Sequence, residues 1–377
     1  MTRRERLMAT LEGRPVDRPA VCFYEINGLD QNPDDPNPFN VFNDPSWRPL
    51  IELARDRSDQ IVMRGVAYKS VTPDPLASTA RSETAMAGGS EVTTRSFQSG
   101  GRTLITRTRR DPEINTIWTV EHLLKDTDDL RAFLETPAAP ADGVVDPSPV
   151  TDTEAAIGDT GIVMIDTPDP LCLAAGLFDM SDYLIIALTE RALFRRLLDH
   201  YAEPLLARTE AIAKAAPGRL WRIYGPEFAS PPYLPPALFD EYVCTYVRPM
   251  IASIQRYGGF ARVHSHGRLA GILDLIAGMG PAGLDPIEPP PQGDIELAEV
   301  RRRIGADTVL FGNIEASDLE NLPTDEFAGK VRRALDEGQA GPGRGFVLMP
   351  SSCPAGRLIT PQTLRNYETM VEMAEAG

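Results

Sequence analysis

Two of the four histidines in this 377-residue chain lie one residue apart, as His264 and His266 in the stretch RVHSHGR. The apolar run GFARVH (259–264) leads directly into them and has the length of a β-strand. Side chains at positions i and i+2 of a strand point the same way, so both imidazoles project together. Zinc accepts neutral imidazoles as ligands. The pair therefore indicates either a metal site or two hydrogen-bonding histidines that hold an anionic substrate or buttress the fold.

A catalytic zinc ion needs a third protein ligand and an open position. Cys353, in MPSSCPAG, can supply a thiolate, and Glu227, in IYGPEFASPPY, can supply a carboxylate. Four further polar groups end or follow apolar runs of strand length: Glu25, Asp166, Glu288 and Asn313. Hydrolases with one or two metals also carry a His-x-His pair, but they need two more histidines at strand ends. His122 and His200 do not follow strand-like runs, which disfavours that class.

Eight apolar runs of strand length punctuate the chain, and helical patterns lie between most of them. The runs are 19–25, 59–63, 161–166, 219–225, 259–264, 283–289, 307–313 and 345–350. The helical patterns are 3–12, 44–57, 181–214, 236–256, 269–279, 295–304 and 324–337. Continuous apolar runs are typical of parallel strands that are covered on both faces. The pattern predicts one domain over 1–377, an α/β fold of the (β/α)8 TIM barrel class.

A barrel would bring the scattered polar residues together. Active sites of such barrels lie at the carboxyl ends of the strands. The groups named above stand at or just beyond those ends. We therefore expect them at one mouth, with the two imidazoles beside the thiol of Cys353.

The region between the second and third strand runs departs from the barrel pattern. Residues 82–118 alternate between apolar and polar, and Gly100-Gly101 is a strong hairpin signal. This predicts a β-hairpin inserted between the second and third barrel strands. The Pro- and Ala-rich stretch 136–152 is expected to be a surface connector inside the same domain. The stretch 341–346, GPGRGF, precedes a strand and so indicates a turn instead of a phosphate cradle.

Composition limits the partners and the compartment. The net charge is −16, from 38 Lys and Arg against 54 Asp and Glu, so we expect no binding to nucleic acid or to anionic lipid. No window approaches about 18 apolar residues, which predicts no membrane span. The four cysteines form no CxxC pair, and the first residues lack the apolar run of a signal peptide. A cytoplasmic location is expected.

Five stretches together resemble the uroporphyrinogen decarboxylase superfamily. They are MTRRERLMATLEGRPVDRPAV at the start, EFASPPYLPPALFDEYV (227–243), HSHGRLAGILDLIAGMGPAGLDPIEPPPQGDIELAEVRRRIG (264–305), LFGNIEASDL (310–319) and GRGFVLMPSSCPAGRLITPQTLRNY (343–367). The similarity covers most of the chain. It implies a (β/α)8 barrel, in agreement with the strand count, and it allows a homodimer.

The resemblance implies one of two chemistries. The decarboxylases of this superfamily hold a substrate with many carboxylates and use an arginine-rich segment after the first strand. Here that position reads CFYEINGLDQNPDD, without arginine, which argues against decarboxylation. The methyltransferases of corrinoid-dependent systems carry a zinc site of the form HxC with a distal Cys. By position, His264 matches the first His, His266 replaces the Cys, and Cys353 matches the distal Cys.

The sequence therefore predicts a zinc-dependent methyltransferase that moves a methyl group between a small O- or S-methyl substrate and a separate corrinoid protein. His264, His266 and Cys353 are the expected zinc ligands. A second His in place of a Cys would make the zinc a stronger Lewis acid, which suits an alkoxide or phenolate oxygen. Glu227 or Glu288 would be the fourth ligand or the proton carrier. The residues expected to contact substrate are Glu25, Asp166 and Asn313. Two alternatives stay open: a decarboxylase without metal, and a non-catalytic barrel that binds a small ligand.

Overall fold

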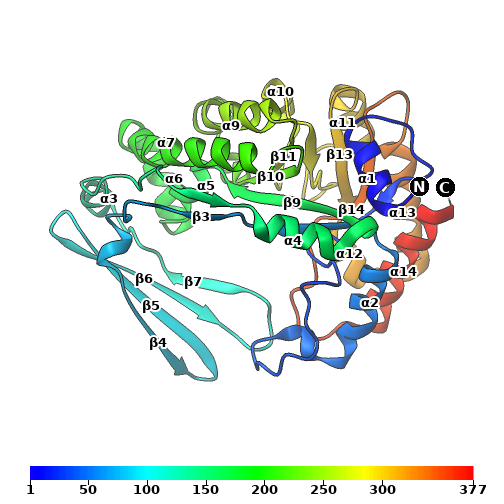
Figure 1. The fold of residues 1–377 in the computed structure, drawn as a ribbon, viewed down its shortest axis with the longest axis horizontal. Helices are drawn as coiled ribbons and strands as arrows, with labels where there is room; N and C mark the ends of the chain where they lie inside the picture. Colours follow the sequence, from blue (N-terminus) through cyan, green and yellow to red (C-terminus); the bar gives the residue numbers. More distant parts are fainter. Residues whose placement is uncertain (377) are drawn as a thin grey trace.

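The computed structural model describes residues 1–376 and contains an eight-stranded, wholly parallel sheet (Figure 1). Its strands are β1 (Ala20–Val21), β2 (Gln60–Arg64), β9 (Gly161–Pro168), β10 (Leu220–Tyr224), β11 (Phe260–His264), β12 (Gly283–Asp285), β13 (Val309–Ile314) and β14 (Phe346–Pro350). Their order is β1-β14-β13-β12-β11-β10-β9-β2. The predicted eight-stranded parallel sheet of an α/β fold is therefore confirmed.

The two end strands of that order are joined through Asp59. Its backbone N–H donates to the carbonyl of Val21 over 2.7 Å, and its carboxylate accepts the N–H of Val21 over 2.9 Å. Arg6 and Arg18 both form ion pairs with the same buried carboxylate. The sheet thus curls into a TIM-like barrel, and Asp59 joins β1 to β2 through one backbone and one side-chain hydrogen bond.

The strands are apolar at consecutive positions because each strand packs on both faces, against the barrel interior on one side and the outer helices on the other. In β9, Ile162 and Met164 point into the barrel interior, while Val163 and Ile165 pack under the outer helices. Leu7 and Leu11 of helix α1 (Arg3–Leu11) join the interior cluster and cover the end where the strands begin. The carboxyl ends of the strands therefore form the open mouth.

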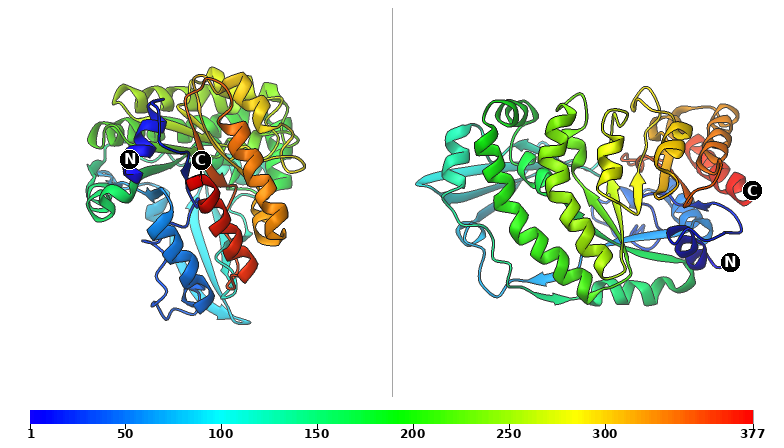
Figure 2. Two further views of the ribbon diagram at one scale, coloured as in Figure 1. Left: turned by 90° about the vertical axis from the view of Figure 1, so that its right-hand side faces the viewer. Right: turned by 90° about the horizontal axis from the view of Figure 1, so that it is seen from above.

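Helices cover the outside of the sheet (Figure 2). The longer ones are α2 (Arg48–Arg57), α4 (Ser148–Ile157), α6 (Met180–Thr189), α7 (Arg191–Ala215), α9 (Thr245–Arg256), α11 (Leu297–Ile304), α13 (Thr324–Gly338) and α14 (Pro361–Ala376). Short helices are α3 (Thr127–Phe133), α5 (Pro170–Ala175), α8 (Pro236–Phe239), α10 (Leu273–Gly278) and α12 (Ala316–Asn321). The buried residues of the helices recur at helical spacing, as in α13 with Phe327, Val331 and Ala334. Among residues 1–376, no helix is long and apolar enough to cross a membrane.

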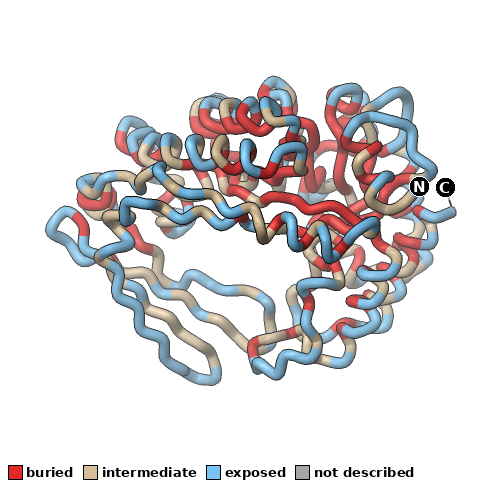
Figure 3. Tube along the Cα trace, in the orientation of Figure 1, coloured by how far each residue is buried: buried red, intermediate tan, exposed pale blue. Residues whose placement is uncertain are grey.

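In place of a single hairpin, the inserted segment forms a four-stranded antiparallel sheet. Its strands are β4 (Arg81–Ala87), β5 (Ser90–Ser99), β6 (Arg102–Arg110) and β7 (Ile117–Glu121), in that spatial order. Gly100 and Gly101 form the β5–β6 turn with φ of 53° and 72°, which favours glycine. The connector 136–152 is also partly ordered, since β8 (Val144–Asp146) pairs with β3 (Ala67–Lys69) and α4 begins at Ser148. The four-stranded sheet of β4 to β7 is far less buried than the barrel strands (Figure 3).

Arg357 connects the segment after β6 of the inserted sheet to the barrel mouth. Its guanidinium donates to the carbonyl of Pro112 after β6 and to Oδ1 of Asn43 after β1, over 2.7 Å each. A bridge between Ile114 and Gly356 lies beside it. One arginine therefore connects three segments that are distant in the sequence.

Replacing Arg357 by alanine is expected to speed amide hydrogen exchange in 37–43 and 111–115 by about tenfold or more. Charge-assisted hydrogen bonds of this kind contribute about 1.5–3 kcal/mol. Hydrogen exchange followed by mass spectrometry measures the effect. Arg48→Ala is the matched control, because Arg48 forms only an exposed pair with Asp34. Unchanged exchange in both segments would contradict the role of Arg357.

Candidate functional site

The ends of β10, β11 and β12 lie in register and place polar side chains inside the barrel mouth. Tyr224 pairs with His264, and His264 pairs with Asp285. Nδ1 of His264 lies 2.8 Å from Oδ2 of Asp285, and both side chains are buried. Burial raises the pKa of Asp285, but the charges of Arg262 and His264 outweigh it, so the pKa lies below its ordinary value. An ionised carboxylate only accepts hydrogen bonds, so Nδ1 of His264 donates and, in the neutral ring, Nε2 carries the lone pair.

His266, two residues after His264, is also bonded to a carboxylate through Nδ1. Its Nδ1 lies 2.7 Å from Oε1 of Glu288, whose other oxygen accepts the N–H of Gly267 over 2.6 Å. The rings of His264 and His266 are 4.6 Å apart and nearly perpendicular. Burial lowers the pKa of His266, but the hydrogen bond and charge of Glu288 outweigh it, so the pKa lies above its ordinary value. The sequence prediction that these two imidazoles lie together is correct in this structure.

Cys353 lies in the loop after β14, and its sulfur contacts a carboxylate. Sγ is 3.8 Å from Oε2 of Glu25. Burial, with the charge of Glu25, raises the pKa of the Cys353 thiol to about 12. Across the described residues 1–376, no three His, Cys, Asp or Glu side chains are grouped so that they could hold a metal ion. The two imidazoles are thus placed as expected, but Cys353 is not grouped with them.

The donor set fits a zinc ion in part. Two imidazoles whose Nδ1 atoms are each bonded to a carboxylate match the pattern of ligating histidines, although Nε2 of His264 contacts the hydroxyl of Tyr24. A third ligand would come from Cys353 only after its thiol leaves Glu25 and loses its proton. Glu227 is the other nearby acid; its Oε2 accepts the N–H of Gly225 over 2.9 Å.

Arg222 of β10, the strand next to β11, contacts two further polar residues at the mouth. It binds both oxygens of Asp166, over 2.6 and 3.1 Å, and it also donates to the hydroxyl of Tyr24. That hydroxyl lies 3.4 Å from Nε2 of His264. Tyr24 holds this position with φ of 49°, a strained value for a residue other than glycine. A hydrogen-bonded path thus runs from Asp166 to His264.

Sequence reasoning missed three members of this network: Tyr24, Arg222 and Asp285. For Arg222 the sequence did contain a signal. In the apolar strand RLWRIYG, residues two positions apart face the same side of the sheet, so the direction of the arginine follows from that of its neighbours. Arg222 shares the parity of Leu220, which faces the barrel interior. Arg262 of β11 is the second such arginine; its Nε lies 2.9 Å from Oδ1 of Asp285 as an ion pair without hydrogen-bond geometry.

A pocket of ≈ 490 Å³ opens beside the outer imidazole. Its polar side consists of Glu227, His266 and Glu288, with Arg268 at its edge. Its apolar side consists of Met180, Phe228, Pro231, Pro232, Tyr233 and Pro291. The predicted residues Glu227 and Glu288 therefore meet at one cavity with His266. The cavity suits a small molecule with an apolar body and one polar end.

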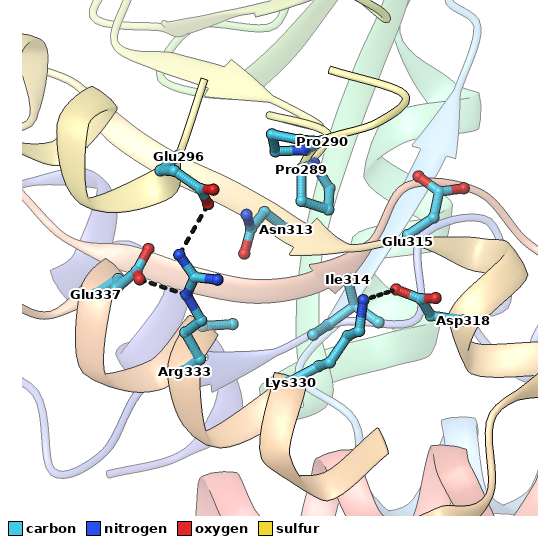
Figure 4. Close-up of a pocket in the computed structure, with 11 residues that line it drawn as sticks. Pro289, Pro290, Glu296, Asn313, Ile314, Glu315, Asp318, Lys330, Arg333 and Glu337 are labelled. Carbon is cyan, nitrogen blue, oxygen red and sulfur yellow. Dashed lines mark hydrogen bonds and ion pairs between the residues drawn. The ribbon is translucent and has the colours of Figure 1, made fainter. Parts of the chain in front are cut away.

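Asn313 lies in a different and smaller pocket of ≈ 110 Å³, at the end of β13 (Figure 4). The cations there are already paired. Arg333 contacts Glu296 over 2.9 Å and Glu337 over 2.6 Å, and Lys330 contacts Asp318 over 2.7 Å. The structure therefore does not bring Asn313 to the cavity beside His266. Asp166 and Glu25 lie at the mouth, Asp166 bound by Arg222 and Glu25 beside Cys353.

The chain is similar to one family model and to several solved structures. The family model described as uroporphyrinogen decarboxylase (URO-D) matches residues 160–376, more than half of the chain. A solved structure of a methyltransferase from Methanosarcina mazei aligns over 100% of this chain and 99% of its own, with 17% identity and a TM-score of 0.61. D-psicose 3-epimerase from Clostridium cellulolyticum H10 aligns over 61% of this chain and 84% of its own, with 10% identity and a TM-score of 0.36. No curated protein sequence matches.

Proposed function

Because this chain belongs to the uroporphyrinogen decarboxylase family, we propose that it is a zinc-dependent methyltransferase. It would move a methyl group between a small O- or S-methyl substrate and a separate corrinoid protein. The observation that carries the proposal is the pair of imidazoles, each bonded through Nδ1 to its own carboxylate. The full-length structural similarity to a protein described as a methyltransferase supports it.

In this proposal His264 and His266 hold the zinc ion, and Cys353 is the third ligand. Zinc bound there would polarise the heteroatom that carries the methyl group. Asp285 and Glu288 fix the orientation of the two rings by binding their Nδ1 atoms, which leaves Nε2 of each ring as the atom that would bind zinc. The hydroxyl of Tyr24 lies against Nε2 of His264 in the structure and would move aside when that nitrogen is used.

Glu227 is the proton carrier in this proposal. Its carboxylate lines the cavity beside His266 and, among the described residues, forms no ion pair with Lys or Arg. It can accept the proton that a thiol or hydroxyl loses as its heteroatom takes the methyl group, or return that proton in the reverse direction. The apolar wall around Phe228 and Tyr233 would exclude water from the reacting end.

Charge at the mouth disfavours decarboxylation of a polycarboxylate. Such a substrate needs several free cations. The two arginines inside the barrel are engaged, Arg222 with Asp166 and Arg262 with Asp285. Glu25 and Glu227 add negative charge close by. Arg268 is the one Lys or Arg that lines the cavity; it forms no ion pair among the described residues, and a single cation is too few for a polycarboxylate. The site is therefore better suited to a small molecule with few or no carboxylates.

Elemental analysis of the purified protein tests the metal assignment. We expect about one zinc per chain, falling below about 0.1 in both His264→Ala and His266→Ala. Cys353→Ser should bind zinc about 10–100-fold more weakly, since one ligand is replaced by a poorer one. His122→Ala is the control, because His122 lies outside the mouth. Zinc content that is equal in all four variants would overturn the assignment.

A further inference from the structure

Three arginines line a third cavity, at the opposite end of the barrel, where the strands begin. The cavity has a volume of ≈ 300 Å³. Arg14, Arg301 and Arg344 line it, together with Gln339 and glycines of the stretch 341–345. This stretch precedes β14, as the sequence indicated for a turn. It lies far along the barrel axis from the two imidazoles, which follow the carboxyl end of β11.

Arg301 is buried without a counter-charge. Its residue is only 7% exposed, yet its guanidinium donates only to backbone carbonyls, those of Ala340, Gly305 and Gly345. Within residues 1–376 it forms no ion pair, and its Nη2 has no acceptor. Gly343 lets the guanidinium pack directly against its backbone, since a Cβ there would come within 2.1 Å of Nη2. Burial lowers the pKa of Arg301, and no acid offsets this.

The other two arginines add to this excess of positive charge. Arg344 donates to the carbonyls of Leu11 and Asp307 and, in the described chain, pairs with no carboxylate. Arg14 is exposed and pairs only with Glu12. The three guanidinium groups therefore have one carboxylate partner among them, although the protein as a whole carries a net charge of −16. The other arginines that are buried, Arg6, Arg222 and Arg262, each have a carboxylate partner.

An unpaired buried charge is costly, and a bound anion would offset it. Guanidinium groups present planar forks that match the oxygens of phosphate and carboxylate groups. We propose that this cavity binds a multiply charged oxyanion, held by Arg14, Arg301 and Arg344. The site is independent of methyl transfer at the mouth. The competing role of the two arginines that donate to carbonyls is to anchor backbone, Arg301 at Ala340 and Gly345 and Arg344 at Leu11 and Asp307.

Isothermal titration of the full-length protein with inorganic phosphate, pyrophosphate and citrate, at constant ionic strength, tests the proposal. We expect at least one anion to bind, and Arg14→Ala and Arg344→Gln each to weaken it at least about tenfold. Binding of phosphate or pyrophosphate assigns a phosphate ligand, and binding of citrate alone assigns a polycarboxylate. Arg302→Ala is the matched control, because Arg302 is the next residue on α11 and pairs with Glu299 at the surface.

Arg14 is exposed, so its alanine variant should fold even if the Arg344 variant does not. Failure of all three anions to bind the wild-type protein would overturn the proposal. Equal binding to the wild type and to Arg14→Ala would also overturn it.

Discussion

Replacing His264 by alanine is expected to lower kcat/KM for methyl transfer by about three orders of magnitude or more. The substitution removes one of two imidazoles whose Nε2 atoms remain available at the mouth, and it leaves Asp285 buried with one partner fewer. The loss should appear mainly in kcat, because the apolar wall that holds the substrate is untouched. Steady-state kinetics with methylcobalamin as methyl donor and small thiols or phenols as acceptors measures it.

One further variant separates a role in metal binding from a role in folding. Asp285→Asn keeps the size of the side chain but loses its charge, so zinc affinity should fall about 10–100-fold. Added zinc should then restore activity to Asp285→Asn and not to His264→Ala. Wild-type activity in His264→Ala would contradict the assignment of the site, whatever the metal content.

Asp59→Ala is expected to destabilise the protein by about 3 kcal/mol, the low end of the range for breaking a buried ion pair. The carboxylate of Asp59 is fully buried and accepts from Arg6, Arg18 and the N–H of Val21. Its loss leaves Arg6 nearly buried with Asp17 as its remaining carboxylate. The seam between β1 and β2 would also lose one of its two hydrogen bonds. Urea unfolding followed by circular dichroism measures the change.

Asp56→Ala is the matched control for this prediction. Asp56 is three residues away and forms an exposed pair with Arg55, so its removal should change stability by less than about 0.5 kcal/mol. Equal unfolding midpoints for Asp59→Ala and Asp56→Ala would show that the seam does not depend on the buried carboxylate.

The strands and the histidine pair could be predicted because their signals are local. A parallel strand covered on both faces needs apolar residues at every position, as in GIVMID of β9, and this pattern is visible in sequence. The i, i+2 spacing of His264 and His266 likewise fixed the direction of their side chains relative to each other. Glu288 was found for the same reason, since it follows the next strand.

The network around Arg222 was hidden because it depends on strand order. Tyr24 follows β1, Arg222 is in β10 and Asp285 ends β12, and only the order of the strands around the barrel brings them together near His264. The partner of Cys353 was also beyond sequence reasoning. Its loop lies next to β1, which brings its thiol to Glu25 instead of into a group with the imidazoles.

The inserted sheet was underestimated because its outer strands carry little apolar signal. Every residue of β4 is exposed, and β7 is nearly as exposed, so alternation alone marked only the central pair β5 and β6. The predicted helix 181–214 is divided into α6 and α7 at Glu190, whose ψ of 42° interrupts the helix although apolar spacing continues on both sides.

Anomalous diffraction at the zinc edge, from a crystal grown in the presence of zinc, tests the central claim most directly. The account predicts one strong peak within bonding distance of Nε2 of both His264 and His266, with the Cys353 sulfur moved from Glu25 to the same ion. A crystal with both imidazoles ordered, no peak between them, and the sulfur still on Glu25 would contradict it.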